Sequence, residues 1–194
     1  VLAATYWALA QMHRAQEDHR SSVFPELTHG LLRDLRPVFG SERGRPFIFA
    51  STGTGRWEAA LTNTLAPGDR VLAARFGQFS HLFIDSAERL GFKVDVIDLE
   101  WGEALEPARI GAALAADPSH AIKAVLLVHN ETSTGVTNDV AGIREAMDEA
   151  AHPALLLVDS VSGLASIDLR HDEWGIDVTV SGSQKGLMLP PGLG

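Results

Sequence analysis

The chain contains two apolar runs of strand length, Ala124–Val128 and Ala154–Val158, with no polar residue inside either run. Strands that are apolar at every position are typical of a parallel sheet whose two faces are both covered. A strand with one solvated face would instead alternate apolar and polar residues. The two runs therefore favour a layered α/β architecture.

The rest of the chain alternates short strand-like runs with amphipathic helices. Strands are expected at 47–50, 70–74, 93–97, 121–128, 154–158 and 176–180. Helices are expected at 22–39, from Gly55 through Leu65, and at 79–90, 107–116 and 139–150. This alternation predicts an α/β fold with three αβα layers and a mostly parallel sheet. No linker, repeat or low-complexity stretch interrupts the pattern, so one continuous domain is expected.

The composition argues against several classes of function. Sixteen basic against 25 acidic residues give a formal net charge of −9, which disfavours a nucleic-acid or membrane surface. Without cysteine, disulfides, thiolate metal sites and cysteine nucleophiles are excluded. No apolar run approaches the ~20 residues that span a bilayer. The apolar start lacks a preceding basic region, so we expect no secretory signal and a cytoplasmic protein.

Polar and glycine residues gather where the expected strands end. Five such segments occur, at 51–55, 75–78, 129–132, 159–160 and 181–185. Open parallel sheets bind ligands at the carboxyl ends of their strands. We therefore expect the five segments to meet at one edge of the sheet and to form a ligand site there.

The segment Thr52–Arg56 joins an expected strand to an expected helix. Its glycines and the free N–H groups of the helix start suit a phosphate dianion. The alternative is a glycine-rich turn without a ligand. The segment lacks the Lys-Ser/Thr of a P-loop and the spacing of a dinucleotide fingerprint, which weakens a nucleotide-binding interpretation.

Lys185 follows the strand expected at 176–180, and Asp159 ends the strand expected at 154–158. Most lysines are solvated, but one among small residues after a buried strand is a candidate for Schiff-base chemistry. A buried carboxylate needs a cationic partner, and a protonated pyridine ring is one. Asp159 could otherwise only cap its strand. Together the two residues are the anchors that a pyridoxal phosphate site requires.

Two further residues at the same edge are candidates for cofactor contacts. Phe76 is either core or a residue that stacks on a flat aromatic cofactor, and Thr132 offers a hydroxyl for a phenolic oxygen. The eight histidines show no metal-like spacing with carboxylates, so no metal site is expected. The absence of a G-x-S-x-G motif argues against a serine hydrolase.

Four segments in order carry a resemblance to a known family: 52–63, 129–136, 157–162 and 181–186. On these segments the chain resembles the class V (fold type I) pyridoxal phosphate aminotransferases, in particular the serine–glyoxylate and alanine–glyoxylate group. The resemblance implies that residues 23–194 form the cofactor-binding large domain, preceded by an N-terminal segment at 1–22. It also implies that a small C-terminal domain with the substrate-carboxylate arginine lies beyond Gly194.

The resemblance assigns the polar anchors of the cofactor. Lys185 would form the Schiff base and act as the proton shuttle, while Asp159 would pair with the pyridinium nitrogen. Thr132 would bond the phenolic oxygen. The phosphate would be held by four residues, namely Thr54, Gly55, Arg56 and Gln184.

The same resemblance places Val161 under the cofactor ring and assigns ring stacking to Phe76, where some relatives carry Trp. Arg56 departs from the family pattern, because a small residue or His is common there. Its guanidinium would either aid the phosphate or face solvent.

The activity that the resemblance implies is the transamination of serine with glyoxylate, which yields hydroxypyruvate and glycine. The expected partners are a small amino acid, a 2-oxo acid and further copies of the chain in a homodimer or larger homo-oligomer. Two alternatives stand beside it. One is another class V activity, such as alanine–glyoxylate exchange or a lyase reaction, and the other is a non-catalytic module that binds a phosphorylated metabolite.

Overall fold

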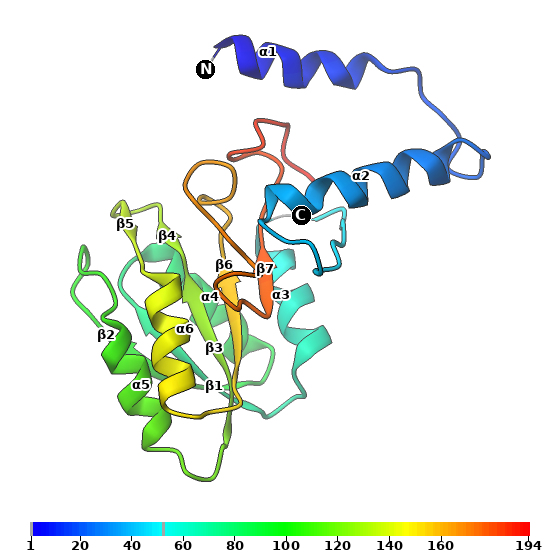
Figure 1. Ribbon diagram of the computed structural model, residues 1–194. Coiled ribbons are helices and arrows are strands. Elements are labelled where there is room, and N and C mark those ends of the chain that lie inside the picture. Colours follow the sequence, from blue (N-terminus) through cyan, green and yellow to red (C-terminus); the bar gives the residue numbers. More distant parts are fainter. Residues whose placement is uncertain (1, 52) are drawn as a thin grey trace.

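Five parallel strands form the central sheet of the computed structural model, which describes residues 2–51 and 53–194 (Figure 1). The strand order is β2-β1-β3-β6-β7. The strands are β1 (Arg70–Arg75), β2 (Lys93–Asp98), β3 (Ile122–Val128), β6 (Leu155–Asp159) and β7 (Val178–Val180). In this register Asp159 lies beside Val128 on one side and Val180 on the other. Strands β3, β6 and β7 therefore end together at one edge of the sheet.

Two pairs of helices cover the faces of the sheet and complete the three expected layers (Figure 1). The helices α3 (Gly53–Thr64) and α4 (Gln78–Arg89) lie on one face, and α5 (Pro107–Ala115) and α6 (Val140–Glu149) pack together on the other. Local signals set their ends. Asp139 caps α6 by accepting the N–H of Gly142 at 2.9 Å, and Pro107 occupies the first position of α5, where no N–H is needed.

The core fills the space between the sheet and its helices. Strands β3 and β6 are buried along almost their whole length, as their apolar sequences predict. Ile110, Leu114 and Ile143 cover one face of the sheet, and Phe83 and Leu61 cover the other. Removing this apolar surface from water stabilises the fold by roughly 25 cal/mol per Å². The predicted fold class is confirmed.

The strand expected at 47–50 is not a buried strand of the sheet, so that prediction was wrong. Phe47 is 63% exposed, and Ile48 and Phe49 are also exposed. The segment is extended, but its backbone pairs with the end of the chain. Phe49 and Gly194 exchange two N–H···O bonds of 2.7 and 2.9 Å, and Ala50 forms an isolated antiparallel bridge with Leu193. Apolar composition and strand propensity are satisfied here without burial.

The N-terminal part lies apart from the αβα layers (Figure 1). It consists of α1 (Leu2–Ala10), the 3₁₀ helix η1 (Gln11–His13) and α2 (Phe24–Val38). The helix expected at 22–39 is present, but none of its residues is buried. Across residues 2–51 and 53–194, no helix combines the length and apolarity that crossing a membrane would require.

Candidate active site

A cavity opens at the carboxyl edge of the sheet, where the five polar segments were expected to meet. Its lining includes residues from four of the five segments; the segment 75–78 contributes none, and Phe79, the residue directly after it, lines the cavity. The lining residues are Thr54, Trp57, Phe79, Leu82, Asn130, Thr132, Asp159, Val161, Ser162 and Lys185. Thr52 of the first segment lies outside the described residues.

The sheet topology explains why the cavity lies here. Strand β1 is flanked by β2 and β3, so the chain leaves β1 toward one side and returns on the other. The loops that follow β1 and β3 therefore diverge, and open α/β sheets bind ligands in the crevice at such a switch point. Phe79, at the start of the helix that follows β1, and Asn130, in the segment that follows β3, line the cavity from the two sides.

Asp159 ends β6 and is 4% exposed. Its Oδ1 accepts the N–H of Val161 at 2.8 Å, and its Oδ2 accepts the indole N–H of Trp57 at 3.0 Å. Burial raises the pKa of Asp159 to about 6, and the charge of Glu131 adds to this rise. The two hydrogen bonds and the charge of Arg56 oppose it. Near neutral pH the carboxylate is therefore ionised but poorly compensated, as a site for a cation would be.

Lys185 lies in a tight turn after β7 and lines the same cavity. Two bonds fix the turn: the hydroxyl of Ser183 donates to the carbonyl of Pro190 at 2.7 Å, and the N–H of Met188 donates to the carbonyl of Lys185 at 2.9 Å. Gly186 packs against residues 164–166 so closely that a Cβ would lie 2.1 Å from the carbonyl oxygen of Leu164. The backbone that carries Lys185 is thus held against the body of the domain.

Arg56 is the fourth residue of α3. It is 3% exposed, so its guanidinium does not face solvent. Its Nη2 donates to the side-chain oxygen of Gln184 at 3.3 Å and to the carbonyl of Leu193 at 3.0 Å. Its Nε and Nη1 are buried and have no hydrogen-bond partner among the residues that the structure describes. Buried unpaired donors are costly, so these two nitrogens favour an anionic partner.

The phosphate-binding candidates form one group at the start of α3. Thr54 lines the cavity, while Gly55, Arg56 and Gln184 lie beside it without being among its lining residues. A Cβ at Gly55 would lie 2.2 Å from the Oγ of Ser51, so a larger residue there would have to displace that hydroxyl. The helix start supplies N–H groups and a positive dipole end toward this group.

Phe76, the expected stacking residue, does not line the cavity. It is 0% exposed, and its N–H donates to the Oγ of Ser80 at 3.0 Å. Phe79, three residues further and in the first turn of α4, lines the cavity instead. The structure thus places Phe76 in the core, while Phe79 and Trp57 are the aromatic residues that line the cavity.

Glu131 links two walls of the cavity, a role that the sequence did not reveal. Its side chain is fully buried, and its Oε2 accepts the N–H groups of Phe79 and Ser80, each at 2.9 Å. Its Oε1 accepts the N–H and the hydroxyl of Ser133 at 3.0 and 2.8 Å. The carboxylate thus ties the start of α4 to the loop that carries Thr132.

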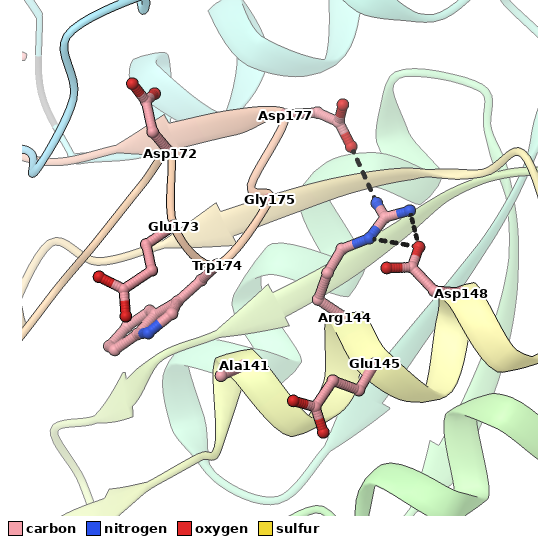
Figure 2. A pocket seen from close by; sticks show the side chains of 9 residues that line it. All are labelled: Ala141, Arg144, Glu145, Asp148, Asp172, Glu173, Trp174, Gly175 and Asp177. Atoms are coloured by element: carbon pink, nitrogen blue, oxygen red, sulfur yellow. Dashed lines mark hydrogen bonds and ion pairs between the residues drawn. The ribbon is translucent and has the colours of Figure 1, made fainter.

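A second hollow lies between α6 and the loop 172–177 (Figure 2). Arg144 projects across it and pairs with Asp148, whose Oδ1 is 2.9 Å from Nε, and with Asp177, whose Oδ2 is 3.6 Å from Nη1. Among the lining residues of this hollow, Arg144 is the one basic side chain, and it is already paired with Asp148 and Asp177. Within the described part of the chain, no group of three or more His, Cys, Asp or Glu side chains could hold a metal ion. The cavity around Asp159 and Lys185 is the candidate site.

Comparisons with known proteins point to one family. The sequence model of the family described as "Aminotransferase class-V" matches residues 5–194. The chain is 58% identical to the serine–glyoxylate aminotransferase of Methylorubrum extorquens over 178 residues, which are 92% of this chain and 44% of that protein. It is 53% identical to the L-aspartate–glyoxylate aminotransferase of Paracoccus denitrificans over 176 residues, or 91% of this chain and 44% of that protein.

A solved structure agrees with these matches. The alanine–glyoxylate aminotransferase of Nostoc sp. superposes with a TM-score of 0.86 at 34% identity, over 97% of this chain and 48% of that one. The chain thus spans less than half of the length of these three proteins.

The contact between Gly77 and Glu131 gives a testable consequence. A Cβ at position 77 would lie 2.4 Å from Cγ of Glu131, so Gly77→Ala must displace the buried carboxylate. We expect the free energy of unfolding to fall by about 1–3 kcal/mol, as for other overpacked cores. Thermal or denaturant unfolding measures it.

Gly30→Ala is the matched control. Its Cβ would meet no atom closer than 3.8 Å, and alanine favours the helix α2. Its stability should stay unchanged or rise. A Gly77→Ala variant as stable as the wild type would contradict the tight packing of Glu131.

Proposed function

The chain belongs to the class V aminotransferase family, and from this premise we propose that the protein is a pyridoxal phosphate-dependent transaminase of serine and glyoxylate. The products are hydroxypyruvate and glycine. The observation that carries the proposal is the meeting of Asp159, Lys185 and the start of α3 in one cavity. The high identity to serine–glyoxylate aminotransferases supports serine as the amino donor.

The polar residues of the cavity fit the cofactor. Its phosphate would be held by Thr54 and Gly55 at the start of α3, with Gln184 and the unpaired Nε and Nη1 of Arg56 beside them. The Arg56 guanidinium is buried, and two of its donors are unpaired. A cation in this state is stabilised by an anionic ligand.

The other end of the cofactor meets the two anchors that the sequence singled out. Asp159 would hold the protonated ring nitrogen, which supplies the cation that this buried carboxylate lacks. Lys185 would hold the cofactor through its Nζ, and Thr132 would bond the phenolic oxygen. Val161 and Phe79 would pack against the ring.

Pyridoxal phosphate supplies an electron sink that stabilises negative charge on the Cα of an amino acid. The chain's own residues do the rest. The Nζ of Lys185 removes the Cα proton and later returns a proton, so a single amine acts as base and acid. The carboxylate of Asp159 keeps a proton on the ring nitrogen and so stabilises the charge that develops in the ring. Trp57, Phe79 and Leu82 form the apolar wall that limits water.

We propose that residues 23–194 form the cofactor-binding large domain and that the N-terminal segment 1–22 packs on a second copy of the chain. Trp7 of α1 is 68% exposed and Tyr6 and Leu9 are exposed beside it, while α2 buries none of its residues. Apolar faces of this kind mark protein–protein contacts. They support a homodimer.

The amino donor is tested by product analysis. The full-length protein, loaded with pyridoxal phosphate, is expected to convert serine and glyoxylate to equal amounts of hydroxypyruvate and glycine. Alanine and aspartate serve as competing donors, because relatives or neighbours with those activities are also similar to this chain. Ready turnover of either one with negligible turnover of serine would exclude the proposed donor.

Lys185→Ala tests the catalytic amine. Loss of the acid–base group is expected to lower turnover by at least the 10²–10⁴-fold typical of general acid–base catalysis. Lys93→Ala and Lys123→Ala are matched controls, because both lysines are exposed near the amino ends of β2 and β3. They should retain activity. Full activity of Lys185→Ala would refute the assignment, and a wild type that binds no pyridoxal phosphate would favour the binding-module alternative.

Sedimentation tests the assembly. The wild-type protein should have the mass of a dimer, and Trp7→Glu combined with Tyr6→Glu should shift it toward the monomer by placing charge in the apolar contact. Trp101→Glu, at a tryptophan that is 59% exposed on a turn, is the control and should leave the mass unchanged. A monomeric wild type would contradict the proposal.

A further inference from the structure

Trp57 joins the start of α3 to the candidate catalytic carboxylate. It is 4% exposed, one residue beyond Arg56, and it lines the cavity. Its Nε1 lies 3.0 Å from the Oδ2 of Asp159, a contact that spans 102 residues of sequence. The contact is therefore a product of the fold and not of a local turn.

The orientation of the indole is fixed by packing. Its ring stacks on Phe83 of α4 with centroids 5.1 Å apart and planes 20° from parallel. An indole has one N–H donor and no acceptor, so a buried tryptophan needs an acceptor at one defined point. Asp159 provides that acceptor. Stacking on Phe83 in turn keeps the N–H aimed at it.

The carboxylate is held by two different elements, one at each oxygen. The N–H of Val161 binds Oδ1 at 2.8 Å from the loop after β6, and Trp57 binds Oδ2 from α3. Two donors on the two oxygens set the plane of the carboxylate. The lone pairs that remain are those that a ligand in the cavity can reach.

We propose that Trp57 is a positioning residue, whose indole N–H keeps the Asp159 carboxylate ionised and turned toward the ring nitrogen of the cofactor. This inference rests on the proposed function, because it assigns Trp57 a part in the same site. Trp57 acts through Asp159 and takes no part in the proton transfers of Lys185.

The hydrogen bond from Trp57 matters because burial and the charge of Glu131 both oppose the ionisation of Asp159. Glu131 disfavours ionisation of Asp159 and Arg56 favours it, while Lys185 lines the same cavity. Burial dominates and raises the pKa of Asp159 to about 6, against the hydrogen bonds from Val161 and Trp57. Loss of the Trp57 bond raises this pKa further, toward neutral pH. Asp159 then carries a proton over a wider pH range and cannot hold a cationic ring.

Trp57→Phe in the full-length protein tests the inference, since it keeps an aromatic ring against Phe83 and removes the N–H. The probe is pyridoxamine 5′-phosphate, which has the ring and phosphate of the cofactor but no aldehyde to react with Lys185. Its Kd is measured by equilibrium dialysis from pH 6 to pH 9. The variant's Kd relative to wild type should be raised about tenfold or more at pH 6.5, the effect of one hydrogen bond to a charged group.

The pH dependence separates positioning from packing. Asp159 of the variant ionises as the pH rises above its raised pKa, so the ratio of the two Kd values should shrink by pH 8.5. A ratio of one at every pH, or a ratio that is raised equally at every pH, would overturn the inference. A wild type that binds no probe would instead refute the proposed function.

Three further variants serve as controls for this experiment. Trp101→Phe removes an exposed indole and should leave the ratio at one. In an Asp159→Asn background, Trp57→Phe should cause little additional loss, because the two residues act as one unit. If Trp57→Phe does not fold, benzothienylalanine at position 57 keeps the shape of indole without the N–H and should give the same pH-dependent ratio. A normal Kd for that variant would overturn the inference.

Discussion

The buried carboxylate of Asp159 is the constraint on which the site depends. It ends a strand in the middle of the sheet, beside Val128 and Val180, where water cannot solvate it. Removing a charge from water costs several kcal/mol, and the bonds from Trp57 and Val161 offset only part of this cost. The remaining deficit is what a cationic ring nitrogen would supply. The buried carboxylate, which costs folding stability, thus favours a cationic ligand.

Much of the fold and the position of the site followed from local pattern. The apolar runs that became β3 and β6 can only be covered on both faces, which fixes a layered sheet. Parallel strands end at a common edge, so Asp159 and Lys185 could be placed together although 26 residues separate them. Thr54 lines the same cavity, although residues 47–50 before it do not form a strand of the sheet. Periodicity and strand ends carry this information without any knowledge of tertiary contacts.

What the sequence could not give depends on tertiary geometry. Phe76 and Phe79 flank the same turn, and only the start of α4 decides which ring enters the cavity. Trp57 reads as an ordinary core residue of a helix until the fold brings its N–H to Asp159. Residues 47–50 have a strand's composition, yet burial requires neighbours that composition does not reveal. A large aromatic residue directly after Arg56 was the one signal that could have drawn attention to Trp57.

The most direct test of this account is to trap the cofactor on its lysine. The full-length protein, loaded with pyridoxal phosphate, is reduced with sodium borohydride, digested and analysed by mass spectrometry. Among residues 1–194 there are three lysines, at 93, 123 and 185. The account predicts the phosphopyridoxyl group on Lys185. A group on Lys93 or Lys123 instead, or no modified peptide at all, would contradict it.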